Sequence, residues 1–217
     1  MYTGRVKVAG PADVRELAAL VISKVAVGPM DNNSYLLRCT RTGDQVLIDA
    51  AAEPDTLLDL VGDDGLTAVI TTHAHRDHWA NALAAVVSHT GAVTYAHPAD
   101  AAAIDIPTRH LVSDGDRISV GAAELQVIHL VGHTPGSIAL LFDDDQGYPH
   151  LFTGDCLFPG GVGRTTSPEA FQSLLGGVVA KIFDSLPDET WVYPGHGDDT
   201  TLGRERPSLS EWAQRGW

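Results

Sequence analysis

Short runs of apolar and β-branched residues recur along the chain and predict a protein rich in strands. In the first half they fall at residues 21–27, 35–38, 45–49, 67–72 and 93–96. In the second half they fall at residues 117–120, 124–131, 138–142, 148–153 and 190–193. Runs of this length are typical of strands in globular sheets. The turn Thr42-Gly43-Asp44 joins two of them, which favours an antiparallel start.

Four segments instead show the apolar spacing of helices. They cover residues 54–61 before Gly62, 79–89 before Gly91, 97–103 and 168–186. The strands come in two blocks, each accompanied by helices. This order predicts an α/β fold in which two sheets pack face to face with the helices outside.

The composition is that of one compact globular domain. The chain has 217 residues, of which 44% are hydrophobic and 19% are charged, enough to bury a full core. We therefore expect a single domain spanning residues 1–217.

The charge and the cysteines narrow the possible partners. Fourteen basic against 28 acidic residues give a net charge of −14, which would repel a nucleic-acid backbone. Cys39 and Cys156 show no spacing typical of a disulfide framework or a thiolate metal site. The apolar stretch 17–27 is too short to span a bilayer, and no signal-peptide pattern precedes it. These features predict a cytoplasmic protein that acts on a small molecule, without nucleic-acid or membrane partners; they leave its oligomeric state open.

The densest group of candidate ligands follows the run at 67–72. His73, His75 and His78 lie there with Asp77 within six residues. His73 and His75 are two apart, so on an extended segment both rings can reach one cation. Asp77 and His78 come where the chain should turn into a helix, and we expect them to face a second cation. A chance surface cluster of histidines would have no reason to follow a buried strand, so metal binding is favoured.

Three further candidates lie in glycine-containing loops after other predicted strands. These are His133, Asp155 and His196. Loops at strand ends present side chains to one edge of a sheet, and glycine allows the backbone to approach a bound ion. Asp49 could support such a site or cap a strand, and the Asp31-Asn32-Asn33 segment could line a pocket or form only a turn. The other histidines are assigned to the surface or core; they are His89, His97, His110, His129 and His150.

Taken together, these motifs resemble a known family. The runs Thr72-His73-Ala74-His75-Arg76-Asp77-His78, Gly132-His133-Thr134-Pro135-Gly136, Thr153-Gly154-Asp155 and Pro194-Gly195-His196 resemble, in this order, the metallo-β-lactamase superfamily and its glyoxalase II-like hydrolases. The segments 154–165 and 195–207 look like those of small single-domain bacterial members. The resemblance implies a four-layer αβ/βα sandwich of two mixed sheets with helices outside. It also places metals in the groove between the loop edges of the sheets.

Carried over by position, the resemblance implies two metal ions. His73, His75 and His133 would hold the first, Asp77, His78 and His196 the second, and Asp155 would bridge them. Imidazole and carboxylate ligands suit two divalent ions, with zinc as the first choice and iron or manganese as alternatives. A hydroxide between two cations is a nucleophile near neutral pH, and the cations polarise a scissile carbonyl. Asp77 would also have a catalytic role, orienting this hydroxide, while Thr72 or Asp49 would support the histidines.

The resemblance is less specific about the substrate. Arg164 matches a position where glyoxalase II-like proteins place a basic residue near a glutathione carboxylate, which makes it a candidate substrate-binding residue. The chain ends about twenty residues after His196, so the helical C-terminal domain of two-domain glyoxalase II is expected to be absent. S-lactoylglutathione is then in doubt as the physiological substrate. Cys156 is expected to pack beneath the site. Asp155 stands where a true β-lactamase would carry a cysteine, which disfavours antibiotic hydrolysis.

Three functions remain open on the sequence. The first is a binuclear metal-dependent hydrolase of a thioester, similar to hydroxyacylglutathione hydrolase. The second is a persulfide dioxygenase with one iron held by the equivalents of His73, His133 and Asp155. Such enzymes usually carry a Pro-Ala-His-Asp-Tyr-like stretch where this chain has Pro194-Gly195-His196-Gly197. The third is a metal-binding protein without turnover.

Overall fold

The first sheet contains most of the N-terminal half of the chain. The structure is a computed structural model that describes residues 1–216. Seven strands form this sheet in sequence order: β1 (Asp13–Glu16), β2 (Leu20–Val27), β3 (Asn32–Cys39), β4 (Gln45–Ile48), β5 (Ala68–Ile70), β6 (Val93–Ala96) and β7 (His110–Leu111). The strands from β1 to β4 pair antiparallel, whereas those from β4 to β7 pair parallel. The sheet is therefore mixed.

The second sheet is built from the C-terminal half. Its order is β15 (Thr200–Thr201), β14 (Trp191–Pro194), β11 (His150–Gly154), β10 (Ile138–Phe142), β9 (Ala123–His129) and β8 (Arg117–Val120). Only β11 and β14 pair parallel, so this sheet is mixed as well. A small hairpin of β12 (Leu157–Phe158) and β13 (Gly161–Val162) follows β11.

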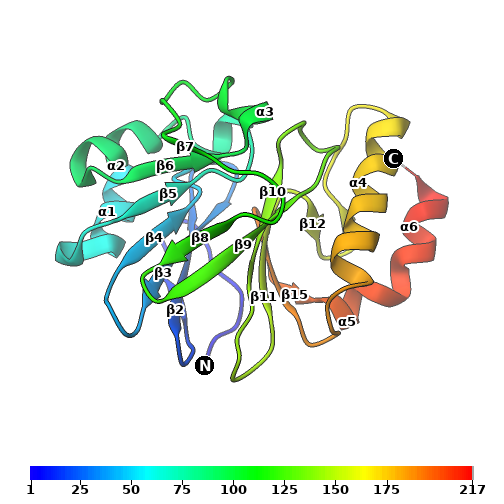
Figure 1. Ribbon diagram of the computed structural model, residues 1–217, viewed down its shortest axis with the longest axis horizontal. Helices are drawn as coiled ribbons and strands as arrows, with labels where there is room; N and C mark the ends of the chain where they lie inside the picture. Colours follow the sequence, from blue (N-terminus) through cyan, green and yellow to red (C-terminus); the bar gives the residue numbers. More distant parts are fainter. Residues whose placement is uncertain (217) are drawn as a thin grey trace.

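Helices cover the outer face of each sheet, which gives the predicted four-layer sandwich (Figure 1). The first sheet carries α1 (Pro54–Val61), α2 (Leu83–Thr90) and α3 (Pro98–Ala101). The second carries α4 (Pro168–Val178), α5 (Leu202–Glu205) and α6 (Leu209–Arg215), and a π-helical turn, Val179–Phe183, extends α4. Short 3₁₀ turns lie at Gly62–Asp64, Arg76–His78 and Arg206–Ser208. No helix in the described part of the chain is long and apolar enough to cross a membrane.

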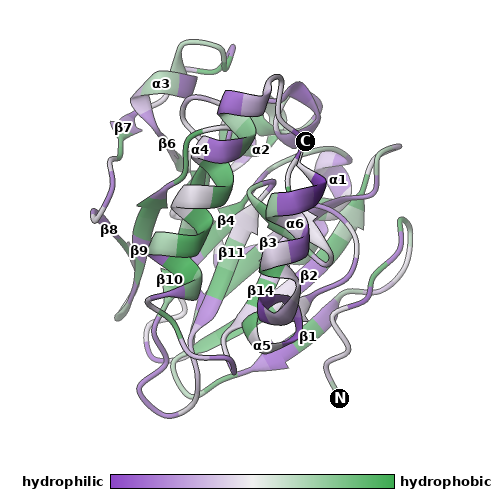
Figure 2. Cartoon of the chain, turned by 90° about the vertical axis from the view of Figure 1, so that its right-hand side faces the viewer, coloured by the Kyte–Doolittle hydropathy of each residue, from purple (hydrophilic) through white to green (hydrophobic). Residues whose placement is uncertain are grey.

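Local sequence explains where the outer helices begin and which face they bury. The Ser167 side chain accepts a hydrogen bond from the Ala170 amide at 3.2 Å and caps α4, while Pro168 occupies its first turn. Phe171, Leu174 and Val178 then fall on one buried face at helical spacing. This face packs against the second sheet, and Figure 2 shows apolar strands behind α4 and α6.

Three apolar layers hold the sandwich together. Leu37, Leu125 and Phe152 represent the layer between the two sheets. Trp79 belongs to the layer under α1 and α2, and Trp212 to the layer under α4 and α6. Each large side chain that is fully buried contributes about 1.5 to 3 kcal/mol relative to exposure. The sheets therefore form a rigid support for the loops at their edges.

Two elements near the candidate ligands are shorter than the sequence pattern suggests. The strand predicted at 67–72 ends at Ile70, because the Thr72 amide donates to the Asp49 carboxylate at 2.8 Å instead of joining a ladder. The helix predicted at 79–89 begins only at Leu83. Before it, the Trp79 indole is buried under the loop and donates to the Ala74 carbonyl at 3.0 Å. β1, α5 and α6 lie in segments for which the sequence pattern predicted no element.

Candidate metal centre

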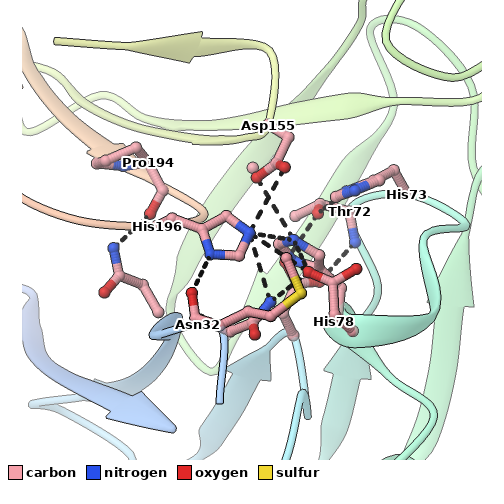
Figure 3. A network of polar contacts seen from close by, with 12 residues as sticks. Asn32, Thr72, His73, His78, Asp155, Pro194 and His196 are labelled. Carbon is pink, nitrogen blue, oxygen red and sulfur yellow. Dashed lines mark hydrogen bonds and ion pairs between the residues drawn. The ribbon is translucent and has the colours of Figure 1, made fainter. Parts of the chain in front are cut away.

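Every histidine and carboxylate singled out as a ligand lies in a loop at one edge of the sandwich. His73, His75, Asp77 and His78 follow β5 in the first sheet. The other three come from the second sheet, where His133 lies between β9 and β10, Asp155 follows β11 and His196 follows β14. Figure 3 shows the side chains of His78, Asp155 and His196 turned toward one another.

The structure brings these seven side chains into three overlapping groups. One contains His73, His75 and His133, one contains Asp77, His78 and His196, and one contains His73, His78 and Asp155. Within each group the potential ligand atoms lie within 4.8 Å of one another. The structure therefore brings together the residues expected for each subsite, and the third group shares members with both sets.

Several buried atoms in this cluster have no hydrogen-bond partner in the described part of the protein. They are Nε2 of His73, Nε2 of His133 and Oδ1 of Asp155. A buried polar atom without a partner costs about 1 to 3 kcal/mol, so native proteins rarely leave several together. Nitrogen and oxygen donors at this separation suit divalent zinc, iron or manganese. The residues fit a metal centre.

Electrostatics distinguish the two subsites. Burial lowers the pKa of His73 well below its usual range, and the neighbouring His78 and His133 lower it further. Burial likewise lowers the pKa of His133. Both rings are therefore held neutral, the form that binds a metal.

The second subsite is dominated by carboxylates. Burial opposes the charged form of His78, but the nearby carboxylates of Asp155 and Asp49 raise its pKa to about 10. Burial also opposes ionisation of Asp77, yet the hydrogen bond from Asn32 and the charge of His78 lower the pKa of Asp77. Without a cation, a proton on His78 balances the acids around it.

Asp49 organises the loop after β5. Its Oδ1 accepts from the Thr72 amide at 2.8 Å, and its Oδ2 accepts from the Thr72 hydroxyl at 2.8 Å. The same Oδ2 lies 2.9 Å from Nδ1 of His78, and the Thr72 hydroxyl lies 3.0 Å from Nδ1 of His73. These contacts confirm that Asp49 and Thr72 support the histidines, which turns the remaining ring nitrogens toward the centre.

A second supporting carboxylate, Asp100 in α3, was not predicted. It is only 2% exposed and accepts from the Ala74 amide at 2.8 Å, the Gly136 amide at 2.7 Å and the Thr134 hydroxyl at 2.5 Å. Asp100 thus connects the loop of His73 and His75 with the loop of His133. In the sequence it looks like an ordinary acid in the first turn of a helix, so only its burial reveals this role.

The outer nitrogens of His133 and His196 are held by backbone carbonyls. Nδ1 of His133 lies 2.7 Å from the Arg164 carbonyl, and Nδ1 of His196 lies 2.9 Å from the Met30 carbonyl. Asn32, at the start of β3, donates to Oδ2 of Asp77 at 2.8 Å. The Asp31-Asn32-Asn33 segment is therefore part of the site. These contacts fix the ring orientations before any ion binds.

Two glycines allow the loops to come close to Asp155. A Cβ on Gly195 would lie 2.2 Å from Oδ1 of Asp155 and 2.8 Å from Cε1 of His78. A Cβ on Gly163 would lie 1.7 Å from the Asp155 carbonyl oxygen. A larger residue would displace the Asp155 carboxylate at Gly195 and the Asp155 backbone at Gly163, so both glycines are a steric requirement.

The remaining candidates occupy different environments. The Arg164 side chain is exposed and makes no hydrogen bond or ion pair within the described residues; it borders a cavity of about 250 Å³ that Trp212 and Arg215 also line. Cys156 is fully buried beneath the site, as expected, and burial raises the pKa of its thiol. His150 is buried in the core, whereas His89 and His110 are exposed.

The layers and the position of the ligand-bearing loops define a class of metal-dependent hydrolytic proteins. Within that class, the family model of the metallo-β-lactamase superfamily matches residues 27–196, and the chain belongs to this superfamily. The resemblance noted in the sequence is thereby confirmed.

Individual relatives place the chain near several branches of the superfamily. A hydroxyacylglutathione hydrolase of Polaromonas is 35% identical over 180 residues, a match that covers 82% of this chain and 66% of the relative. A crystal structure of TTHA1623 in a di-iron-bound form is 37% identical, with a TM-score of 0.69, covering 84% of this chain and 96% of the other. ETHE1 from Myxococcus xanthus is 30% identical, with a TM-score of 0.75, covering 89% of this chain and 86% of the other.

Proposed function

We propose that the protein is a binuclear metal-dependent hydrolase that cleaves a thioester. The observation that carries this proposal is the presence of a second complete ligand group, Asp77, His78 and His196, beside the group of His73, His75 and His133. The chain therefore offers donors for a second ion beside the first. Asp155 lies between the groups, with carboxylate oxygens 3.4 Å from Nε2 of His78 and 3.6 Å from Nε2 of His133.

The side chains at the centre have different roles in such a reaction. Bound divalent ions would lower the pKa of a water molecule and polarise the scissile carbonyl. His73 and His133 supply neutral ring nitrogens. Asp77 has a 27% exposed side chain, compared with 12% for Asp155, so Asp77 faces the open side. In this proposal Asp77 accepts a hydrogen bond from the attacking water and orients it. The Asn32 side-chain amide donates to Oδ2 of Asp77 at 2.8 Å and holds the carboxylate in place.

The thioester part of the proposal is supported by the hydroxyacylglutathione hydrolase of Polaromonas. The match covers 66% of that relative, so the whole relative's substrate does not carry over directly. Arg164 is the residue we assign to substrate binding. Its guanidinium is exposed and unpaired among the described residues, while its carbonyl touches His133. An anionic group on the thiol carrier could pair with it close to the metal centre.

A persulfide dioxygenase is the second candidate function. It would need one iron held by His73, His133 and Asp155, and the likeness to ETHE1 fits this alternative. All three residues lie at the centre, where the rings of His73 and His133 have centroids 4.8 Å apart. The single-iron mechanism gives no role to His196.

The experiment that separates these functions uses His196→Ala, with His129→Ala as the matched control. His129 is the last residue of strand β9 in the second sheet, but it belongs to none of the three ligand groups. We expect about two metals per wild-type chain by elemental analysis, and loss of thioester absorbance with S-lactoylglutathione or another acyl thioester. His196→Ala should lose one metal and most of this activity, whereas His129→Ala should lose neither.

Other outcomes would contradict the proposal. One iron per chain, oxygen uptake with a persulfide and an unaffected His196→Ala variant would establish the dioxygenase. Two bound metals without turnover of either substrate class would instead favour a metal-binding protein.

A further inference from the structure

The loop that carries His196 is held by its backbone carbonyls. The Pro194 carbonyl accepts from the Tyr35 hydroxyl at 2.6 Å, and the Gly195 carbonyl accepts from the Asn33 amide at 2.7 Å. The Gly197 carbonyl accepts from Nζ of Lys24 at 2.7 Å, and the Asn33 side chain donates to both outer carbonyls at 2.9 Å. The carbonyls on both sides of the proposed ligand are thus occupied by donors from elsewhere in the fold.

Lys24 is the most unusual of these donors, because its side chain is completely buried. Besides the Gly197 carbonyl, its ammonium contacts Oδ1 of Asp199 at 2.6 Å and the Gly4 carbonyl at 2.9 Å. The three acceptors use all three of its protons. Burying a charge is unfavourable unless it is fully paired, so these contacts specify one position for the chain around Gly197.

The donors and the loop come from opposite sheets. Lys24 lies in β2, and Asn33 and Tyr35 lie in β3, all in the first sheet. The loop of His196 follows β14 in the second sheet. Its neighbours in the second subsite, Asp77 and His78, belong to the first sheet. The contacts of Lys24 therefore connect the two halves that must meet to complete this subsite.

We propose that Lys24 is a positioning residue for the second metal subsite: together with Asn33 and Tyr35, it fixes the loop of His196 across the two sheets. Lys24 acts through the Gly197 carbonyl and touches neither substrate nor metal. The inference rests on the proposed binuclear function, because it assumes that His196 is a metal ligand. The inference predicts that the buried ammonium of Lys24 affects metal binding at the second subsite and not at the first.

The test compares three purified proteins. Lys24→Met removes the ammonium while keeping most of the side-chain volume. Lys24→Met/Asp199→Asn also removes the buried carboxylate that the single variant leaves unpaired, and should restore much of the melting temperature. Ile118→Ala is the control for a damaged core, because Ile118 packs in the same layer between the sheets but on β8, at the opposite edge of the second sheet from β14 and β15.

The readout is the affinity of each subsite for Co²⁺, followed by its visible absorption and by elemental analysis. We expect both Lys24 variants to bind the first ion with wild-type affinity and the second at least tenfold more weakly, while Ile118→Ala binds both normally at a lower melting temperature. If Lys24→Met does not fold, Tyr35→Phe removes only the hydroxyl on the Pro194 carbonyl and should weaken the second ion severalfold.

The inference is overturned if the double variant folds and binds two ions with wild-type affinity, or if Ile118→Ala loses the second ion to the same extent. Failure of the proposed function has a different signature, because the wild-type protein would then bind a single ion, or would bind two ions without hydrolysing a thioester. The two failures are read from different samples.

Discussion

The metal centre and the cluster around Lys24 both bury charged side chains, yet they differ in how those charges are satisfied. We define the Lys24 cluster as Lys24, Asp199, Tyr2 and Trp191. Both carboxylate oxygens of Asp199 are used there: Oδ1 binds Lys24 at 2.6 Å, while Oδ2 accepts from the Tyr2 hydroxyl at 2.6 Å and the Trp191 indole at 2.8 Å. At the candidate metal centre, Oδ1 of Asp155 is buried and makes no hydrogen bond within the described residues; Nε2 of His78 lies 3.4 Å away from it. Burial of charge alone does not indicate a ligand site; unpaired atoms that converge do.

His150 shows why convergence matters. It is fully buried, and its Nε2 also has no partner among the described residues. Its Nδ1 lies 2.8 Å from the Tyr193 hydroxyl, and among residues 1–216 no other ligand atoms form a metal-binding group with it. Burial lowers the pKa of His150 to about 3, and nearby Arg15 adds to the shift. A single unpaired nitrogen is tolerated in a neutral ring, so His150 is a core residue as expected.

Removing one carboxylate from each region should give the largest contrast. Asp155→Ala should lower hydrolytic activity about 10³-fold or more, because this side chain connects both subsites. In metal-free protein it should lower stability less than Asp199→Ala does, because a protonated His78 keeps the Asp49 carboxylate as a partner at 2.9 Å. Asp199→Ala should instead lower the free energy of unfolding by about 3 to 5 kcal/mol, because it leaves the Lys24 ammonium buried without its partner.

Urea denaturation of the metal-free variants measures the second half of this contrast. Asp198→Ala is the control, because Asp198 is exposed and paired only with the exposed Arg5. Equal destabilisation by Asp155→Ala and Asp199→Ala would show that the two regions do not differ in the way described.

The pH dependence of stability should show that His150 is held neutral in the folded protein. Its folded pKa lies below its unfolded value of about 6.5, so the unfolded state binds a proton first as pH falls. Its contribution is therefore complete above about pH 6.5 and is lost as pH falls toward about 3. Between pH 7 and pH 4 we expect a loss on the order of 3 kcal/mol in metal-free protein.

His150→Asn cannot titrate in this range, and it should flatten the stability profile relative to the wild type. Chemical denaturation between pH 4 and 7 measures the difference, with the exposed His89→Asn as control. Parallel profiles for His150→Asn and the wild type would show that His150 is not held neutral.

The sequence was most informative where chemistry and local structure coincide. His73, His75, Asp77 and His78 could be grouped because they crowd directly behind a buried strand. The two-sheet sandwich followed from the order of strands and helices. The start of α2 could not be predicted, because it depends on the tertiary burial of Trp79 under the metal loop.

Supporting residues were harder to predict than ligands, because their roles depend on contacts across the fold. Asp100 and Lys24 look like ordinary helix and strand residues until their burial is known. Asn33 reaches the loop of His196, 160 or more positions away in the chain, at Pro194 and Gly197. Nothing in the local pattern around these residues encodes such partners, so they emerge only from the packing of the two sheets.

Asp49 allows a test of the residues that support the candidate metal ligands. Asp49→Asn keeps the shape of the side chain but weakens the acceptor that faces Nδ1 of His78 and the Thr72 hydroxyl. We expect metal affinity or activity to fall about 10- to 100-fold, with most of the fold retained. Competition with a chromogenic chelator measures the affinity, and Asp105→Asn, an exposed acid paired with Arg76, is the control. Unchanged affinity would mean that Asp49 only accepts the hydrogen bond from the Thr72 backbone amide and does not support metal binding.

Arg164 should give the smallest effect, because it is exposed and lies outside the ligand groups. Arg164→Ala keeps the backbone carbonyl that binds Nδ1 of His133, so the metal content should stay at the wild-type value. If the guanidinium pairs with an anionic thiol carrier, KM should rise about 3- to 10-fold for that thioester while kcat stays constant. Arg76→Ala, which removes an exposed arginine from the loop after β5, should leave KM unchanged. A thioester of an uncharged thiol should be hydrolysed equally by the wild type and Arg164→Ala. A fall in kcat with constant KM would instead place Arg164 among the residues that hold His133.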